Sequence, residues 1–382
     1  MKKKHKKGIC ADGRRIRVVH VLSDRNIGGA GKQLYYLLSA ADHSEFEYSV
    51  ILPTGSAAAP LIRSTGVEVT ESDYACAEYS PKAIRELFRV FREIKPDIVH
   101  THSSVNARIA AAKARVPVKI LTKHCSDLPP RAMRVFPVKT ACRLHWALTL
   151  SGAIATDDSA AAALRSCGVP KKKTVTVYNG SLPLRRADEK ECSALRRRLG
   201  IPEGAYVSGL FARLEPVKGV ENLLRTAALC LRQTGNLYFL IVGKGSAEEK
   251  LRELAVRYGI ADRVIFAGFA EDVSAYMSLC SLNLNCSLGT ETSNLAAIEG
   301  MSIGVMPVMT DTGGSKRLCE GRGVCVPADD PPAMAEAIMS LLRDPGQIAC
   351  MSERCKNDWK NRYTAQRMAS ETEAFYKSFI IN

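Results

Sequence analysis

Short runs of β-branched and apolar residues alternate with longer amphipathic stretches along most of this chain. In the first half, this pattern predicts β-strands at residues 17–22, 48–52, 97–101, 118–122 and 174–178. It predicts helices from the glycine turn at 28–31 to about residue 41, and at 81–94, 103–115 and 131–149. Strand–helix units that repeat in this way predict a parallel sheet with helices on both faces.

The same pattern starts again in the second half. Strands are predicted at residues 207–212, 238–242, 264–267, 282–285, 305–309 and 324–326, and the chain after Pro345 is predicted to be helical as far as residue 381. Two α/β domains in tandem predict a cleft between them, because open parallel sheets bind ligands at the carboxyl ends of their strands.

Composition and turn residues set the expected boundaries of these domains. We expect a disordered basic tail at 1–14 and a first α/β domain at 15–182. Turn residues followed by a charged stretch predict a hinge and linker at 183–203. A second α/β domain is expected at 204–345, and helices at 346–382 are expected to pack back toward the first domain.

The overall composition is that of a globular protein rather than of a membrane-spanning or disulfide-linked one. Of the 382 residues, 46% are hydrophobic and 24% are charged. The longest weakly polar stretch, 144–156, is too short to cross a bilayer, and the sequence shows no apolar leader near its start. The 13 cysteines are odd in number and include no C-x-x-C pair, so we expect reduced cysteines in a cytoplasmic protein.

The positive charge is concentrated at the start of the chain. The net charge is +15, and residues 1–17 carry eight Lys/Arg against one Asp, so seven of these charges lie in that segment. This asymmetry predicts attraction to anionic lipid headgroups at the inner face of the cell membrane. Nucleic-acid binding is the rival functional interpretation of this tail, although no nucleic-acid partner is expected, and a merely solvated tail is the other alternative.

Two glutamates eight residues apart, Glu291 and Glu299, flank a short apolar run at 295–298. The run predicts the first turns of a buried helix, with Ser293 or Asn294 as its N-cap. A helix N-terminus favours anions, so a phosphorylated ligand is expected there, with the carboxylates facing neutral hydroxyls. Two surface glutamates with accidental spacing are the alternative interpretation.

Two cations, Arg213 and Lys218, follow a predicted strand of the second half. A guanidinium fork and an ammonium at the carboxyl end of a strand suit a diphosphate. Gly243-Lys244-Gly245 follows the next strand and allows close approach of the backbone to a ligand, but it is not a complete dinucleotide fingerprint. Ordinary surface cations are the alternative.

Taken in chain order, these motifs resemble a retaining GT-B glycosyltransferase of glycosyltransferase family 4. The ordered set is R-L-x-P-x-K-G at 213–219, G-x-G at 243–245, E-x7-E at 291–299 and Thr-Asp-Thr-Gly-Gly at 310–314. The first half adds the glycine loop at 27–30, H-x-H at 100–102, the strand end at His124 and Asn179-Gly180. The resemblance covers nearly the whole chain after residue 14 and implies two Rossmann-like domains.

The resemblance also implies roles for individual residues. Arg213 and Lys218 would hold the donor diphosphate, Glu299 the ribose and Glu291 the transferred sugar, with His124 near the donor–acceptor junction. The remaining donor-binding residues would be Gly28, Gly29, Gly243, Gly268, Phe269, Ser293, Asn294 and Leu295. Ser293-Asn294 departs from the pattern common in the family, and there the bulkier Asn294 is expected to reshape the sugar pocket.

The function implied is a hexosyltransferase that uses a UDP- or GDP-linked sugar and needs no metal or other cofactor. The acceptor would be a lipid-linked or cell-surface glycan, as in polysaccharide biosynthesis of the cell envelope. A GT-B epimerase or phosphorylase and a non-catalytic partner subunit of another glycosyltransferase are the alternatives. His20 is expected in the core. His100 and His102 share one strand face, where they are able to bind a metal, but the sequence shows no third ligand.

Overall fold

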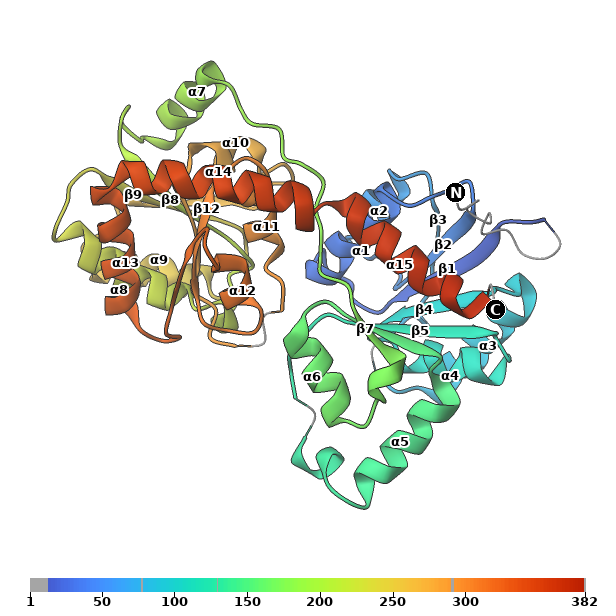
Figure 1. The fold of residues 1–382 in the computed structure, drawn as a ribbon. Coiled ribbons are helices and arrows are strands. Elements are labelled where there is room, and N and C mark those ends of the chain that lie inside the picture. The colour runs from blue at the N-terminus through green and yellow to red at the C-terminus, as the bar shows by residue number, and fades with distance from the viewer. Residues whose placement is uncertain (1–12, 77, 129, 290–291, 381–382) are drawn as a thin grey trace, which may run out of the picture. The chain divides into compact units, whose positions relative to one another are not determined.

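The computed structural model describes residues 13–76, 78–128, 130–289 and 292–380. The chain forms two compact units, and it passes from the first to the second between Gly180 and Ser181 and returns to the first between Thr364 and Ala365. Each unit contains one parallel sheet with helices packed against it (Figure 1). The predicted α/β class with two Rossmann-like domains is therefore confirmed.

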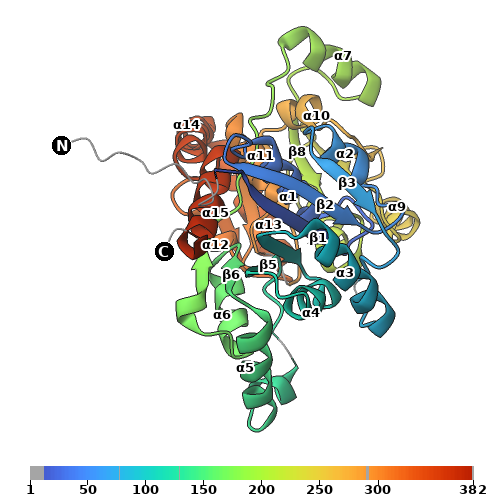
Figure 2. The ribbon, with the colours of Figure 1, turned by 90° about the vertical axis from the view of Figure 1, so that its right-hand side faces the viewer.

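The first sheet has the strand order β3-β2-β1-β4-β5-β6-β7 (Figures 1 and 2). Its strand order reverses between β1 and β4, which makes the carboxyl ends of these two strands the natural ligand side. The prediction missed β3, which is polar and largely exposed, and β6, whose Gly-Ala-Ile-Ala sequence lacks a strong β signal. The strands are β1 Ile16–Leu22, β2 Phe46–Leu52, β3 Glu68–Glu71, β4 Ile98–His102, β5 Val118–Lys123, β6 Gly152–Ala155 and β7 Thr174–Thr176.

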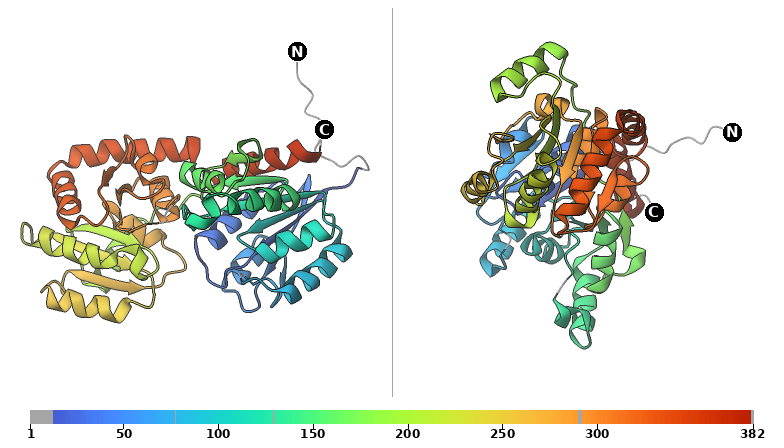
Figure 3. Two further views of the ribbon diagram at one scale, coloured as in Figure 1. Left: turned by 90° about the horizontal axis from the view of Figure 1, so that it is seen from below. Right: turned by 90° about the vertical axis from the view of Figure 1, so that its left-hand side faces the viewer.

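Helices cover both faces of this sheet. Side chains of β1 and β4 that include Val19, Val21 and Val99 form a core with α3 and α4, and α15 lies on the opposite face (Figure 3). The helices are α1 Gly29–Ser39, α2 Ala59–Arg63, α3 Pro81–Ile94, α4 Val105–Lys113, α5 Val138–Thr149, α6 Asp158–Ser166 and α15 Ala365–Ile380, with short 3-10 turns η1 Arg131–Arg134 and η2 Lys171–Lys173.

The helix predicted at 131–149 is interrupted. It consists of the turn η1 and the helix α5, separated by residues 135–137. Pro137 has no amide hydrogen to donate and restricts the residue before it, so a continuous helix through this point is disfavoured. The interruption leaves Phe136 and Val135 outside any helix.

The second sheet has the strand order β10-β9-β8-β11-β12-β13 and is parallel throughout. Its strands are β8 Tyr206–Phe211, β9 Leu237–Val242, β10 Val264–Gly268, β11 Leu282–Asn285, β12 Met306–Thr310 and β13 Val324–Val326. Its helices are α7 Glu189–Leu199, α8 Val220–Leu231, α9 Glu248–Arg257, α10 Ser274–Leu279, α11 Leu295–Ser302, α12 Ser315–Cys319, α13 Pro331–Arg343 and α14 Pro345–Arg362, with the turn η3 Pro216–Lys218.

The C-terminal helical segment is divided between the two units. Helix α14 belongs to the second unit, where the Trp359 indole nitrogen donates to Ser181 Oγ at 3.0 Å. Helix α15 belongs to the first unit, where Glu373 accepts hydrogen bonds from the Tyr48 hydroxyl and from the amide of Asp42. Tyr376 of α15 is completely buried, so this helix is part of the core of the first unit.

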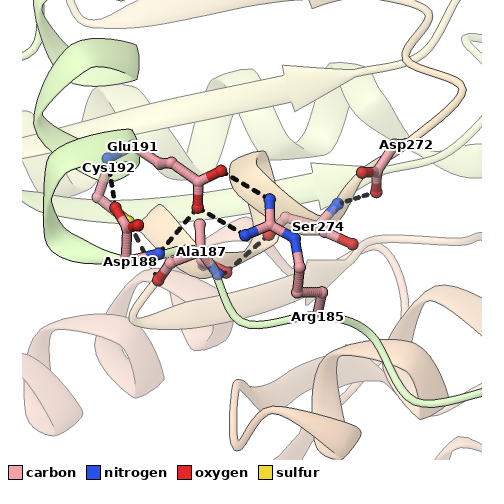
Figure 4. A network of polar contacts seen from close by, with 8 residues as sticks. Arg185, Ala187, Asp188, Glu191, Cys192, Asp272 and Ser274 are labelled. Atoms are coloured by element: carbon pink, nitrogen blue, oxygen red, sulfur yellow. Dashed lines mark hydrogen bonds and ion pairs between the residues drawn. The ribbon is translucent and has the colours of Figure 1, made fainter.

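The segment predicted as a linker at 183–203 contains α7 and is attached to the second unit. Figure 4 shows the guanidinium of Arg185 against the carboxylate of Glu191, with nitrogen–oxygen distances of 2.6 and 2.8 Å. Asp188 and Glu191 form a reciprocal capping box at the start of α7, and the Ala187 amide donates to Ser278 Oγ. The D-x-x-E spacing in the sequence indicates the start of this helix.

The basic segment at the start of the chain is partly anchored. Arg14 forms a bidentate pair with Asp97, and Asp97 also accepts the amide of Arg17. The charge of Arg14 therefore belongs to the folded unit, while residues 1–12 of the predicted tail lie outside the described residues. Among the helices that the structure describes, none combines the length and the apolar character needed to cross a bilayer.

Candidate active site

Backbone contacts between neighbouring loops build the carboxyl edge of the second sheet. A Cβ on Gly219 would lie 1.9 Å from the carbonyl oxygen of Cys286, and one on Gly243 would lie 1.9 Å from that of Ala212. The amide of Leu214 donates to the carbonyl of Lys244 at 2.9 Å. The close approach that Gly243 permits is therefore to the chain itself, and it fixes the loop that carries Arg213.

Arg213 and Lys218 lie on this fixed loop, between the end of β8 and the start of α8. Arg213 is exposed and Lys218 is half-buried. Glu215, between them in the sequence, is engaged by the Ser246 hydroxyl at 2.7 Å, and this hydrogen bond is the main cause of its lowered pKa. Because Glu215 is held by Ser246, the loop presents two cations with a fixed backbone.

Helix α11 begins as the sequence predicted. Asn294 is its N-cap, and its Oδ1 accepts the amide of Ala297 at 2.9 Å. The residue that departs from the family pattern therefore stabilises the helix start. Leu295 and Glu299 are buried, and Glu299 is only 1% exposed. Glu291 lies outside the described residues, so its predicted role stays a prediction.

The loop after β12 meets the segment just before α11. The amide of Gly314 donates to the carbonyl of Thr292 at 3.0 Å, and Thr292 precedes the half-buried Ser293. This contact joins the Thr-Asp-Thr-Gly-Gly motif to the start of α11. Two motifs separated in the sequence thus lie together at the carboxyl edge of the sheet.

Strand β10 ends at Gly268 at the same edge, and Phe269 follows it. Gly268 has φ +75°, and its carbonyl accepts the amide of Gly243 at 2.8 Å. Phe269 is an exposed aromatic side chain, with 59% of its surface accessible. The structure therefore places the predicted base-contacting pair directly beside the glycine loop after β9.

In the first unit, Gly28 and Gly29 follow β1 and begin α1. Gly28 is the N-cap residue and provides no side-chain cap for the first turn of the helix. A Cβ on Gly29 would meet no atom of the described chain within 4 Å. The amide of Gly28 donates to the carbonyl of Asn26 at 2.9 Å, and a Cβ on Gly28 would lie 3.1 Å from the Asp24 carboxylate, so the open space is beside Gly29 alone.

His124 follows the last residue of β5 and is connected to two other histidines. Its Nε2 lies 2.8 Å from Nδ1 of His102, and Nε2 of His102 lies 3.0 Å from Nδ1 of His20. Burial lowers the pKa of His124 to about 4, with a smaller contribution from the charge of Lys123. The ring of His124 is therefore neutral at physiological pH.

The sequence did not reveal this cluster. His20 was expected in the core, where it lies, but strand pairing sets it opposite His100 on the same sheet face as His102. His100 also contacts Thr122 Oγ1 at 2.6 Å and the Tyr376 hydroxyl. One nitrogen from each of the buried rings of His20, His100 and His102 lies within 4.8 Å of the others, so the third nitrogen missing from the sequence argument comes from β1. Strand parity combined with the β1–β4 pairing would have found it.

Comparison with protein families matches both halves of the chain. Residues 205–344 match the family model described as Glycosyl transferases group 1. Residues 27–181 match the model described as Glycosyltransferase Family 4. The two matched ranges contain nearly all of the site residues described above.

Individual relatives cover most of the chain at low identity. N-acetyl-alpha-D-glucosaminyl L-malate synthase of Bacillus anthracis is 22% identical over 81% of this chain and 82% of its own length. Phosphatidyl-myo-inositol mannosyltransferase of Mycolicibacterium smegmatis is 26% identical over 90% of this chain and 85% of its own length. The structure of HepE from Anabaena, in complex with UDP and glucose, has a TM-score of 0.81 at 21% identity and covers 95% of this chain and 100% of its own.

Proposed function

The chain belongs to glycosyltransferase family 4, the glycosyl transferases group 1, and from this membership we propose a specific reaction. It transfers a hexose from a UDP- or GDP-linked sugar to an acceptor hydroxyl, with retention of the anomeric configuration. The acceptor is a lipid-linked or cell-surface glycan. Two relatives support a hexose-like sugar by their names, which contain N-acetyl-alpha-D-glucosaminyl in one case and mannosyltransferase in the other.

The observation that carries this proposal is the fixed loop after β8. Its backbone is held by Gly219, Gly243 and the Leu214–Lys244 hydrogen bond, and it bears Arg213 and Lys218. A rigid loop that bears two cations pre-organises positive charge for a diphosphate, and charge that is already in place stabilises the leaving group without reorganisation. The complex of HepE with UDP and glucose supports a nucleotide sugar as donor.

Each unit has its own part in the proposed reaction. In the second unit, Arg213 and Lys218 offset the charge that develops on the leaving diphosphate, while Glu299 binds the ribose hydroxyls. Gly268 and Phe269 meet the base. In the first unit, Gly28 and Gly29 let their loop close over the donor phosphates, and His124 contacts the transferred sugar. The two cations do the electrostatic work that a divalent ion does in other transferases, so no metal is required.

The test starts with donor identity. Thermal-shift screening against UDP- and GDP-sugars should give one or two stabilising donors, and mass spectrometry of glycan and lipid acceptors incubated with them should show a mass gain of one hexose residue. The product should keep the donor's anomeric configuration by NMR, and a chelator should not slow the reaction. An inverted product would overturn the mechanism. Donor binding with neither transfer nor donor hydrolysis would favour the non-catalytic partner subunit.

The same proposal places the protein at an anionic membrane surface. Phe136, Leu144 and Leu148, in and just before α5, are 83%, 63% and 68% exposed. Arg131 and Arg143 are exposed in the same segment. Apolar side chains with neighbouring cations are the pattern of segments that lie in a membrane interface rich in anionic lipid.

Liposome sedimentation tests the membrane location. Replacing Leu144 and Leu148 by Ser should lower binding to vesicles with anionic lipid, and deleting residues 1–12 should lower it further while turnover on a soluble acceptor is kept. The deletion stops before Arg14 because that side chain is paired with Asp97. Val256→Ser removes an equally exposed side chain, 69% accessible, from α9 and is the matched control. Unchanged binding in the first two variants would rule out this location.

A further inference from the structure

Two thiols of the second unit meet at the end of helix α12. Cys319 is the last residue of α12, and Cys325 is the middle residue of strand β13. The Cys319 thiol lies within hydrogen-bond reach of the Cys325 sulfur, and it also lies 3.3 Å from the carbonyl oxygen of Val324. The turn between helix and strand therefore brings together two cysteines that are six residues apart in the sequence.

The turn that joins the two cysteines is packed and fixed. Arg322, in this turn, is 4% exposed, and its guanidinium pairs with Asp358 and donates to the carbonyl of Arg317. The amide of Gly323 donates to the carbonyl of Cys319 at 2.8 Å. The closeness of the two sulfurs is therefore a property of the folded turn, and it does not depend on a chance encounter of flexible segments.

The two thiols differ in exposure and in acidity. Cys319 is 3% exposed, whereas Cys325 is half-buried. The hydrogen bond between them lowers the pKa of Cys325, and the same contact together with burial raises the pKa of Cys319. A thiol has one proton, so Cys319 donates to the Val324 carbonyl while Cys325 is a thiol, and to the Cys325 sulfur once that is a thiolate. Asp311 and Lys316 also lie near Cys325, but they are paired at 2.7 Å, so their charges largely offset each other.

We propose that Cys325 and Cys319 form a peroxide-sensitive dithiol, in which Cys325 is the attacking cysteine and Cys319 the resolving one. The Cys325 thiolate attacks an oxygen of hydrogen peroxide, the O–O bond breaks, and a sulfenic acid and hydroxide form. The hydroxide recombines with the proton that Cys325 released. The Cys319 sulfur then attacks the Cys325 sulfur, the S–O bond breaks, and the departing hydroxide leaves as water with the Cys319 proton. Two thiols thus lose two electrons and two protons, and the peroxide is reduced to two waters.

The disulfide would join the two sides of a loop at the carboxyl edge of the sheet. Strand β12 leads into the Thr-Asp-Thr-Gly-Gly motif at 310–314, and α12 follows it. Strand β13 pairs with β12, with Cys325 opposite Met309. A bond from Cys325 to Cys319 at the end of α12 therefore closes the loop covalently. The amide of Gly314 in this loop donates to the carbonyl of Thr292, so the restraint reaches the segment before α11.

A third thiol lies close to this pair, but it does not fit the attacking role. Cys355 of α14 is completely buried, and its thiol donates to the carbonyl of Arg322 at 3.2 Å. Burial raises its pKa to about 12. A buried, protonated thiol neither meets peroxide nor attacks it, because the thiolate is the nucleophile. A bond between Cys319 and Cys355 is the competing product that the first test distinguishes.

The first test maps the disulfide in the wild-type full-length protein. The protein is treated with hydrogen peroxide, alkylated, and digested with trypsin without reduction. Trypsin separates the two cysteines into the peptides 318–322 and 323–343, each of which contains one cysteine. We expect these peptides to be linked, and a dithiol reductant to release them. Absence of the linked pair, or a link from peptide 318–322 to the peptide of Cys355, would overturn the proposal.

The second test separates the two roles with single substitutions. In Cys319→Ser the oxidation should stop at a sulfenic acid on Cys325, which dimedone traps. In Cys325→Ser both the disulfide and any dimedone adduct on Cys319 should be absent. Cys350→Ser removes an exposed cysteine of α14 and is the control, which should form the disulfide as the wild type does. Dimedone labelling of Cys319 in Cys325→Ser would overturn the assignment of the roles.

The third test measures the reactivity of Cys325 without any substitution. Cys192 is also half-buried, but burial raises its pKa, so it is a matched reference within the same molecule. At pH 7 and with limiting iodoacetamide, Cys325 should be alkylated about threefold or more faster than Cys192, because only the thiolate reacts. Equal or slower alkylation of Cys325 would overturn its attacking role.

The last test concerns the restraint on the loop. Hydrogen exchange of peptides that cover residues 311–318 should be about threefold or more slower in the oxidised protein than in the reduced protein, because a covalent link suppresses local opening. Peptides from β8 are the internal control and should not change. Unchanged exchange at 311–318 would overturn the restraint. None of these measurements uses a donor, an acceptor or turnover, so their outcome is independent of the proposed transfer reaction.

Discussion

The two units share one architecture but build their functional edges by different means. In the second unit, glycines at 219 and 243 bring backbone against backbone, and charged side chains stand on the fixed loop. In the first unit, Gly29 is beside open space, and the defining feature is a buried line of neutral histidines. The second unit thus presents charged side chains on a fixed loop, while the first unit encloses neutral imidazoles in its core.

The two units also differ in the titratable side chains that they contain. All seven histidines of the sequence lie between residues 5 and 145, so residues 181–364 contain none. The core of the second unit instead contains cysteines such as Cys230 and Cys286, and burial raises the pKa of each to about 12. Between pH 5 and 7 the two units are therefore expected to respond differently to protons.

The largest predicted effect is a selective loss of stability in the first unit at mildly acidic pH. A histidine whose pKa is lowered in the folded state binds more protons when the protein is unfolded. Its contribution to the free energy of unfolding is therefore complete above pH 6.5, and it is lost as the pH falls toward the pKa of the folded state. For His20 that pKa is about 3. Each fully buried histidine should therefore lower the free energy of unfolding by about 2 kcal/mol between pH 6.5 and 5. Glu373, whose pKa is raised by burial, offsets part of this loss.

Hydrogen exchange at pH 7.5 and 5, corrected for intrinsic rates, measures this difference within one molecule. Peptides from β1 and β4 should lose protection by on the order of a hundredfold or more, given the free-energy change expected for several histidines. Peptides from β8 and β11 are the internal control and should change little. Equal loss in both units would contradict the division.

The second prediction compares glycines of the two units. Gly219→Ala should lower the free energy of unfolding by about 3 kcal/mol, because a side chain there combines a left-handed backbone with a clash against the Cys286 carbonyl. Gly29→Ala should be neutral or stabilise by up to about 1 kcal/mol, since Ala favours a helix and the space is open. Urea unfolding of both variants measures the contrast. A similar loss in the two would show that the glycine loop of the first unit is also packed.

The sequence predicted both α/β units, and the elements that it did not predict were missed for physical reasons. The alternation of strands and helices predicted both sheets because buried parallel strands are strongly apolar. The prediction missed the polar edge strand β3. It also missed the helix α7, because its many charged residues were interpreted as a linker. Arg213 and Lys218 could be proposed from the sequence because they lie in the loop that follows a strand, and their contact with a diphosphate stays a prediction. The line of histidines from His20 to His124 could not be, because it depends on which strands are neighbours, and sequence order alone does not give that.

The third prediction tests whether reactivity and binding belong to different units. His124→Ala should leave affinity for a nucleoside diphosphate almost unchanged, because that affinity is assigned to the second unit. Transfer should fall by about a hundredfold or more, the scale of losing a positioned catalytic group. Calorimetry measures the affinity for the nucleoside diphosphate, and initial rates measure the transfer. Full activity would return His124 to a structural role, and a large loss of nucleotide affinity would contradict the separation.

The smallest predicted effect is on donor binding by the second unit. Arg213→Ala and Lys218→Ala should each weaken binding of the nucleoside diphosphate by about ten- to a hundredfold, since each removes a charge-assisted contact worth roughly 1.5–3 kcal/mol. Lys250→Ala removes the same charge from α9, where the side chain is 69% exposed and paired with Glu221, and such a surface pair contributes little. Its affinity should therefore match the wild type. If all three variants bind equally well in calorimetry, the fixed loop after β8 does not hold the diphosphate. If all three lose affinity alike, net charge rather than the position of the two cations controls binding, and the contrast between a charged loop in one unit and neutral imidazoles in the other does not explain it.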